Sequence, residues 1–230
     1  MYQYNDDSLM LHNDLYQINM AESYWNDGIH ERIAFFDLYF RKMPFNSGYA
    51  VFNGLKRVVN FIENFGFTNE DITYLKSIGY KEDFLNYLKD LKFTGNIKSM
   101  QEGEICFGNE PLLRVEAPLI QAQLIETILL NIINFQTLIA TKASRIRQIA
   151  THDTLMEFGT RRAQEIDAAL WGARAAFIGG FDSTSNVRAG KLFNIPVSGT
   201  HAHALVQTYG DEYIAFKKYA ERHKNCVFLV

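Results

Sequence analysis

Three short stretches in the second half of the chain decide how its fold is interpreted. They are EFGTRR at residues 157–162, GGFDSTSN at residues 179–186 and SGTHAH at residues 198–203. Each stretch follows a short apolar run and consists mostly of Gly, Ser, Thr, Arg and His. This layout is typical of an α/β protein in which the ends of strands present backbone donors and a few reactive side chains to a ligand.

Strand and helix patterns alternate through this part of the chain. Apolar runs predict strands at residues 155–158, 175–178, 196–198 and 226–230, and the segments between and after them predict helices at residues 162–171, 183–192, from about 203, and 211–223. Strands that alternate with helices are joined by crossovers, which predicts parallel strands in a sheet or a barrel. A complete barrel of this kind has eight strand–helix units and the chain supplies about four, so a truncated barrel is expected.

The N-terminal part of the chain has a different pattern. Helical spacing occurs at residues 13–25, capped by Asn13, and at residues 49–65 and 81–91, while TNED at residues 68–71 is the capping signature of another helix. Strands are predicted at about residues 32–40, 95–100, 104–107 and 112–116. Apolar pairs repeat at nearly helical period from residue 124 to residue 139 and predict a long, mostly buried helix, whose C-terminal end carries Lys142, Arg145 and Arg147.

The change of pattern divides the chain into two domains. We place the boundary before the long helix, which gives domains 1–118 and 119–230, with barrel strands starting at about residue 154. A boundary near residue 150 is the alternative.

Composition and charge exclude several classes of protein. The 230-residue chain has a net charge of −3, so no basic field indicates binding to nucleic acid. Cys106 and Cys226 form no paired metal or redox spacing and indicate a reducing compartment. The N-terminus lacks the pattern of a secretory signal, and polar residues interrupt the apolar stretch at 120–140, so no membrane span is expected. These features predict a cytoplasmic protein.

Each cluster has a structural explanation beside the functional one. Phe158 and Arg161 suit ring stacking and anion binding, or equally a core side chain and a surface cation. The Gly-rich turn before Ser183 suits phosphate binding at a helix N-terminus, or simple capping, and it matches neither a Walker loop nor a dinucleotide fingerprint. His201 and His203 do not favour zinc, and they leave open a capped helix start or a nucleophilic imidazole.

Six motifs taken together resemble the nicotinate phosphoribosyltransferase family. The motifs are NDLYQ at 13–17, FRK at 40–42, GYAVF at 48–52, EFGTRR at 157–162, GFDSTSN at 180–186 and SGTHAH at 198–203. They occur in the order found in the family and cover essentially the whole chain. The resemblance implies a type II phosphoribosyltransferase fold, with an N-terminal α/β sandwich domain followed by an irregular α/β barrel. Members of the family are roughly twice as long, so the chain resembles their N-terminal half.

The resemblance also implies a reaction. Family members form nicotinate mononucleotide and pyrophosphate from nicotinate and phosphoribosyl pyrophosphate, and they couple this step of NAD biosynthesis to ATP hydrolysis, as ATP-dependent enzymes of the ligase class. Mg²⁺ is expected to enter with pyrophosphate or ATP. A homodimer with shared active sites is the implied assembly, with no nucleic acid and no membrane as partner.

Roles for single residues follow from the matched motifs. The resemblance implies that Tyr16, from the partner subunit, and Phe158 sandwich the pyridine ring. Arg41 would serve the pyrophosphate from that same subunit, Arg161 would line the ring and phosphate site, and Thr200 would contact substrate. His203 matches the histidine that ATP phosphorylates, whereas no role is implied for His201.

Ser185 bears on the choice of substrate. The sister family that uses nicotinamide carries an aspartate at the matching position, which would repel the carboxylate of nicotinate, while a serine can donate to it. Nicotinate is therefore favoured, and two alternatives remain: a nicotinamide-using enzyme, or a non-catalytic truncated remnant. The 230-residue chain alone is expected to be inactive and poorly stable, because the strand at 226–230 and its neighbours would present unpaired edges.

Overall fold

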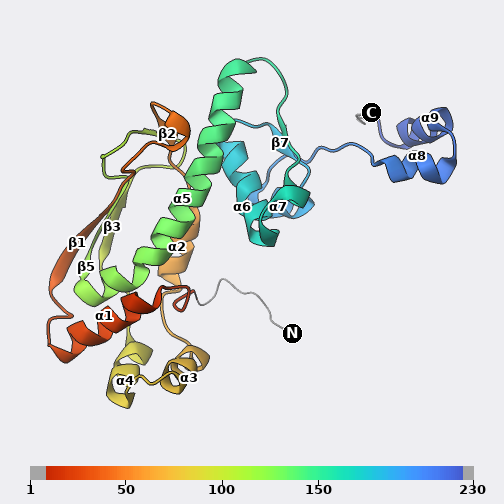
Figure 1. The fold of residues 1–230 in the computed structure, drawn as a ribbon. Helices are drawn as coiled ribbons and strands as arrows, with labels where there is room; N and C mark the ends of the chain where they lie inside the picture. The colour runs from red at the N-terminus through yellow and green to blue at the C-terminus, as the bar shows by residue number, and fades with distance from the viewer. Residues whose placement is uncertain (1–8, 225–230) are drawn as a thin grey trace. The chain divides into compact units, whose positions relative to one another are not determined.

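The computed structural model describes residues 9–224 and has an α/β architecture (Figure 1). The chain divides into two compact units, Met1–Lys142 and Ala143–Val230, and each has its own packing. The expected domain boundary at residue 118 coincides with the start of the long helix, whereas the two units divide within that helix. The strand predicted at residues 226–230, with Cys226, lies outside the described residues.

A three-stranded antiparallel sheet organises the first unit. Its order is β1 (Ile33–Leu38), β5 (Leu113–Pro118) and β3 (Asn96–Ser99), with Ile33 opposite Pro118 and Asn96 opposite Glu116. A second antiparallel pair joins β2 (Ala50–Val51) to β4 (Ile105–Cys106). All four strands predicted for this part of the chain are confirmed. β2 is the one strand of these five that the pattern did not predict.

The long helix α5 (Leu119–Ile149) supplies much of the core of the first unit. Four of its apolar side chains are almost completely inaccessible: Ile120, Leu124, Ile125 and Ile128. α5 is long and apolar enough to cross a membrane by composition, but 56% of its most apolar window is buried within the chain. Two buried threonines on α5 also accept backbone N–H bonds, Thr141 from Val51 (2.9 Å) and Thr137 from Asn53 (3.1 Å). The helix therefore fixes the position of β2.

Helix α1 (Leu15–Asn26) confirms the predicted first helix, but its cap differs. Asp14, not Asn13, occupies the N-cap position. The Asn13 side chain instead donates to the carbonyl of Leu124 at 2.6 Å, and this tertiary contact outweighs local capping.

The segment at 49–65 was predicted wrongly over its first residues. β2 occupies Ala50–Val51, and helix α2 (Leu55–Glu63) begins only after Gly54, whose φ of 108° suits glycine. The short 3-10 helix η1 (Pro44–Asn46) lies just before this segment.

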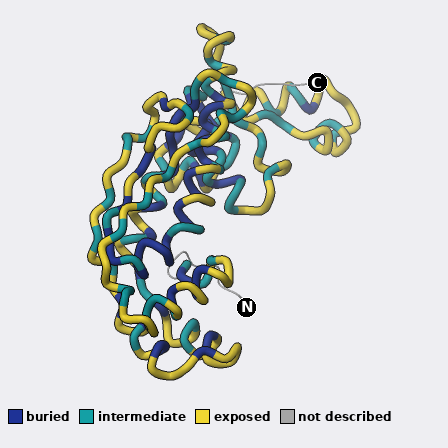
Figure 2. Tube along the Cα trace, turned by 60° about the vertical axis from the view of Figure 1, so that its left-hand side comes forward, coloured by how far each residue is buried: buried dark blue, intermediate teal, exposed yellow. Residues whose placement is uncertain are grey.

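The next two helices follow the predictions. α3 (Asn69–Ser77) has the expected capping box, in which the Asp71 N–H donates to Thr68 Oγ1 at 3.1 Å and the Thr68 N–H donates to Asp71 Oδ2 at 2.8 Å. α4 (Glu82–Asp90) confirms the helix predicted at 81–91. Figure 2 shows buried and exposed residues alternating along the helices and strands, as expected of elements that turn one face to a core.

The second unit contains short parallel strands with helices between them. β6 (Met156–Glu157) pairs in parallel with β7 (Ser183–Thr184), and Val197 forms a parallel bridge to Thr184. The other elements are η2 (Thr160–Arg162), α6 (Glu165–Ile178), α7 (Val187–Phe193), α8 (His203–Tyr209) and α9 (Glu212–Arg222). The parallel arrangement that the alternating pattern predicted is therefore present.

The strand predicted at residues 175–178 is wrong, because these residues form the last turn of α6. The helix continues through Gly172 because Ala173, Ala175 and Ala176 after it are strong helix formers, and Gly179 and Gly180 then end it. The second strand is β7 at Ser183–Thr184, which the prediction had assigned to the start of a helix. That helix, α7, begins at Val187 with Asn186 as its N-cap.

Candidate active site

Two of the predicted site loops meet where β6 and β7 end. Phe158 follows β6 and Ser185 follows β7, and parallel pairing brings both ends to one edge. The Ser185 N–H donates to the carbonyl oxygen of Glu157 at 2.9 Å. The Ser198 N–H donates to the Thr184 carbonyl at 3.1 Å, which adds a third chain segment. We call the edge formed by residues 158, 185 and 198 the strand-end edge.

The side chains at this edge are available to a ligand. Phe158 is 37% exposed, so one of its ring faces can stack on a planar molecule. Arg161 is exposed on η2, which begins directly after Gly159, and it forms no ion pair with the residues described. Ser185 is half-buried between β7 and α7. The structure thus places an aromatic face, a guanidinium group and a hydroxyl group on neighbouring loops.

The carboxylate of Glu157 was not predicted to matter, and it connects these loops. One of its oxygens accepts the N–H of Gly159, and the other accepts the hydroxyl of Thr184 at 2.7 Å. Thr184 is completely buried, and its oxygen also accepts the N–H of Asn186 at 3.0 Å. The Asn186 side chain then caps α7 through the N–H of Ala189. No local pattern could predict this network, because Glu157 and Thr184 are 27 residues apart in the chain.

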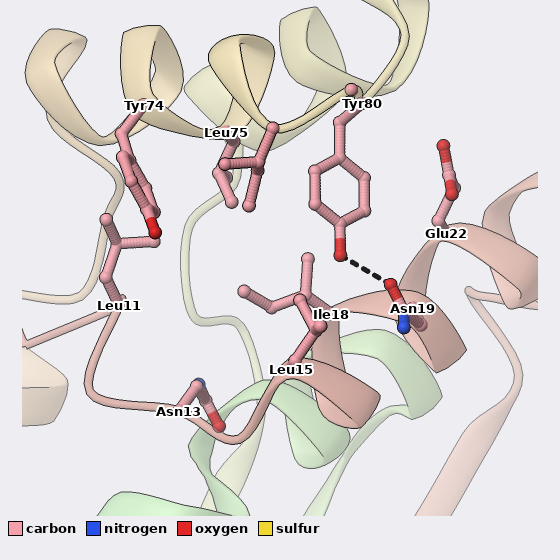
Figure 3. A pocket seen from close by; sticks show the side chains of 11 residues that line it. Leu11, Asn13, Leu15, Ile18, Asn19, Glu22, Tyr74, Leu75 and Tyr80 are labelled. Carbon is pink, nitrogen blue, oxygen red and sulfur yellow. Dashed lines mark hydrogen bonds between the residues drawn. The ribbon is translucent and has the colours of Figure 1, made fainter.

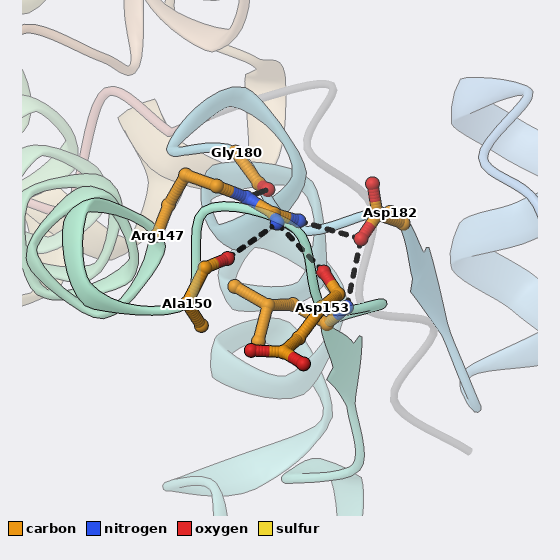
Figure 4. A network of polar contacts seen from close by, with 6 residues as sticks. Arg147, Ala150, Asp153, Gly180 and Asp182 are labelled. Carbon is orange, nitrogen blue, oxygen red and sulfur yellow. Dashed lines mark hydrogen bonds and ion pairs between the residues drawn. The ribbon is translucent and has the colours of Figure 1, made fainter.

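An ion pair holds the opposite ends of the same strands (Figure 4). Arg147 Nη2 lies 2.5 Å from Asp182 Oδ2, and the guanidinium also donates to three carbonyls, those of Gly180, Ala150 and Asp153. The Leu155 N–H donates to Asp182 Oδ2 at 2.7 Å. This backbone bond, followed by Arg147, lowers the pKa of the Asp182 carboxyl below its usual value. The carboxylate therefore stays charged near neutral pH.

Thr200 and His203 lie further along the chain. Residues 198–202 form neither helix nor strand, Thr200 is half-buried, and His203 is exposed as the first residue of α8. His201 packs against Phe216 and Tyr219 of α9, with ring centroids 4.9 and 6.3 Å apart. These ring contacts pack the segment before α8 against α9.

Tyr16 and Arg41 belong to the first unit. Tyr16 is 52% exposed on α1 and lines a hollow of about 390 Å³. Arg41 lines a hollow of about 330 Å³ between β1 and α5. The two hollows share Leu38, Tyr39, Glu126 and Leu130, so they adjoin. The structure thus brings these two predicted residues to one region of their unit.

A larger cavity of about 580 Å³ lies between α1 and α3 (Figure 3). Leu11, Leu15, Ile18 and Leu75 form apolar walls, and the Tyr80 hydroxyl donates to Asn19 Oδ1 at 2.6 Å. None of the predicted site residues lines it. Within residues 9–224, no group of three His, Cys, Asp or Glu side chains is arranged to hold a metal ion.

Comparison with known proteins decides the family. A family model described as the nicotinate phosphoribosyltransferase (NAPRTase) N-terminal domain matches residues 11–134. The chain belongs to the nicotinate phosphoribosyltransferase family. A nicotinate phosphoribosyltransferase of Bacillus subtilis is 67% identical over 100% of the chain, which covers 47% of that protein. Nicotinate phosphoribosyltransferase 2 of Arabidopsis thaliana is 46% identical over 86% of the chain and 36% of its own length.

Two solved structures have a fold similar to that of the chain. The crystal structure of human nicotinic acid phosphoribosyltransferase superimposes with a TM-score of 0.80 at 39% identity, over 85% of this chain and 40% of that one. A nicotinate-nucleotide pyrophosphorylase from Pyrococcus furiosus gives a TM-score of 0.80 at 25% identity, over 99% and 52% of the two chains. The chain therefore spans about half the length of the relatives it matches, or less.

Proposed function

We propose that this chain provides the nicotinate-binding part of a nicotinate phosphoribosyltransferase. The observation that carries the proposal is the parallel pairing of β6 and β7, which places Phe158, Arg161 and Ser185 on neighbouring loops. In the proposed reaction, nicotinate and phosphoribosyl pyrophosphate give nicotinate mononucleotide and pyrophosphate, coupled to ATP hydrolysis. Membership of the family supports the transfer step. The remaining strands of an irregular α/β barrel would complete the pocket.

The chemistry needs placement more than a strong base. The pyridine nitrogen is already a nucleophile, so it forms the new bond to the ribose carbon while the bond from that carbon to pyrophosphate breaks. Phe158 would stack on the ring, Arg161 would hold anionic groups beside it, and the Ser185 hydroxyl would donate to the carboxylate. Thr200, at the third segment, would add a further substrate contact.

Tyr16 and Arg41 are proposed to act across a homodimer. Both are exposed, and the hollows that they line adjoin. In a dimer with shared active sites, Tyr16 would cover the second face of the ring, and Arg41 would neutralise the departing pyrophosphate.

Magnesium is proposed to enter as the counter-ion of pyrophosphate or ATP. The two carboxylates close to the strands do not fit a metal site. Both oxygens of Glu157 accept hydrogen bonds from the chain, and Asp182 is paired with Arg147. No step is therefore assigned to a metal held by these residues.

His203 is the proposed site of phosphorylation by ATP. Its side chain is exposed at the start of α8, where a phosphate can reach it. A phosphorylated His203 would add negative charge three residues after Thr200 and so alter the affinity of the site for its substrates. Mapping label from γ-labelled ATP should find phosphohistidine at residue 203 in the complete product of this gene. The His203→Asn variant should lose the label, and His152→Asn, another exposed histidine, should retain it.

A competition assay tests whether the enzyme prefers nicotinate to nicotinamide. Nicotinate and nicotinamide are compared as acceptors of phosphoribosyl pyrophosphate, using the 230-residue chain and the complete gene product. Preference for nicotinate, reduced in a Ser185→Asp variant, is expected. Preference for nicotinamide would show that Ser185 has been misinterpreted, and no turnover by either protein would favour a non-catalytic role.

A further inference from the structure

Glu157 connects the two substrate loops of the strand-end edge without facing the ligand. Its carboxylate accepts the Gly159 N–H on one side and the Thr184 hydroxyl on the other, so both oxygens are occupied by the chain. We propose that Glu157 is a positioning residue that couples the loop of Phe158 and Arg161 to the loop of Ser185. This coupling sets the preference for a ligand carboxylate, and it rests on the function proposed above.

The first loop is held at Gly159. Gly159 is the N-cap of η2 and separates Phe158 from Arg161, so fixing its N–H fixes the direction of the chain between them. A Cβ atom at residue 159 would lie 2.7 Å from Glu157 Oε1. A side chain at residue 159 would therefore displace the carboxylate of Glu157, although the φ of −80° at this position is accessible to any residue.

The second loop is held through Thr184. A carboxylate can only accept, so the Thr184 hydroxyl must donate its single proton to Glu157 and accept the Asn186 N–H. Ser185 lies between these residues, and its own N–H donates to the Glu157 carbonyl at 2.9 Å. Its backbone is thus fixed on both sides by bonds that lead to Glu157.

The register of the strands does not depend on this carboxylate. Asp182 binds Leu155 twice, through its own N–H to the carbonyl at 2.8 Å and through its carboxylate to the N–H at 2.7 Å. Arg147 holds Asp182 in place. Loss of the bond from Glu157 to Thr184 should therefore loosen the two loops and leave the strands paired.

Substitution of Thr184 separates positioning from folding. Thr184→Val keeps the branched shape of the side chain and replaces the hydroxyl with a methyl group, which can neither donate nor accept. In the complete gene product, the KM for nicotinate should rise roughly tenfold, with a similar loss of preference over nicotinamide and a smaller change in kcat, as expected when one hydrogen bond to a charged group is lost. Thr184→Ser should restore most of the preference. Thr73→Val removes a threonine hydroxyl bond in α3, far along the chain, and is the matched control.

The result that overturns the proposal is specific. If Thr184→Val lowers the rates with nicotinate and nicotinamide by the same factor, the residue contributes only to folding. If Thr184→Ser behaves like Thr184→Val, the hydroxyl is not the group that matters.

Amide hydrogen exchange tests the coupling without relying on activity. In the 230-residue chain, Thr184→Val should speed exchange of the Gly159 and Asn186 amides by about tenfold. The Leu155 amide, bound to Asp182, should be unaffected. Unchanged exchange at Gly159 would show that the loops are not coupled. If the unsubstituted gene product turns over neither acceptor, the proposed function fails, and this measurement decides the coupling by itself.

Discussion

At the scale of single residues, close contacts make sharp predictions. A Cβ atom on Gly95 would lie 2.4 Å from Ala117 Cβ and 2.7 Å from the Glu116 carbonyl oxygen. Because this neighbour is the backbone of β5, it cannot move cheaply. We expect Gly95→Ala to lower the free energy of unfolding by about 1–3 kcal/mol, measured by urea denaturation followed at Trp25.

Gly48→Ala provides the control for Gly95→Ala. No described atom lies within 4 Å of a Cβ atom placed on Gly48. Its effect should fall within about 0.5 kcal/mol. Equal losses in the two variants would show that contact with β5 is not the cause.

The buried thiol of Cys106 should make the free energy of unfolding depend on pH in the alkaline range. Burial raises the pKa of this thiol from 9.0 to about 11, although a backbone hydrogen bond with Ala50 opposes the shift. A raised folded-state pKa gives stability that is complete below pH 9 and is lost as the pH rises toward 11. The difference in unfolding free energy between the native chain and Cys106→Ser should therefore shrink across that range. Comparing the two proteins removes the alkaline contribution of Tyr87, whose pKa is also raised by burial.

The same burial should protect Cys106 from reagents. In a Cys226→Ser background, a thiol reagent at pH 8 should label Cys106 no faster than the folded structure opens to expose this thiol. Labelling at the rate of a free thiol in the absence of denaturant would contradict the buried position of Cys106.

At the scale of elements, Asp182 holds the N-terminal ends of β6 and β7 together through its hydrogen bonds to Leu155. Its folded pKa lies below the usual value, so its contribution to stability is present above pH 3.8 and is lost as the pH falls through the folded pKa. We expect Asp182→Asn to be less stable at pH 7 and to lose less stability on acidification than the native chain. Asp153→Asn is the control, because Arg147 contacts only the backbone carbonyl of Asp153 at 2.8 Å. An acid profile unchanged in Asp182→Asn would rule out this role.

Local signals predicted most elements well. The capping box at Thr68, the alternation in β1 and β5, and the apolar period of α5 each depend on residues close in sequence. The errors at Ala175–Ile178 and at β2 have one cause. Short apolar runs fit a helix or a strand equally well, and their packing partners decide between the two.

The candidate site also contains features that local motifs predicted and contacts that they could not predict. The patterns predicted that Phe158 would lie at the end of a strand and Ser185 near the start of a helix, and the parallel pairing of β6 with β7 places both at one edge. The carboxylates of Glu157 and Asp182 could not be predicted to bind Thr184 and Leu155, because partners 27 residues apart meet only after the strands have paired. The roles of Tyr16, Arg41, Thr200 and His203 stay predictions.

At the scale of the whole molecule, the two units have unequal cores. Among the described residues, the largest fully buried side chains, such as Phe52 and Phe84, all lie in the first unit. A buried cluster of the second unit comprises Leu170, Ala173 and Ala189, with Phe193 against it. We therefore expect the second unit to unfold first, without two-state behaviour of the chain.

The two tryptophans report on this separately. In the first unit, the ring centroids of Trp25 and Phe84 are 5.7 Å apart, and in the second unit those of Trp171 and Phe193 are 5.0 Å apart. In Trp25→Phe, the fluorescence of Trp171 should change at a lower urea concentration than that of Trp25 does in Trp171→Phe. Coincident transitions in both variants would show that the units unfold together.

The pairing of β1 with β5 matters during synthesis of the chain. Leu38 of β1 pairs with Leu113 of β5, which is synthesised about 75 residues later. At typical rates of translation, synthesis of the intervening residues takes roughly 4–15 s. During that interval Phe35 and Phe36 emerge from the ribosome with no strand to accept them, and they can pair with other nascent chains. Charges on both sides, Glu31 and Arg32 before the strand and Arg41 and Lys42 after it, oppose such encounters until β5 is made.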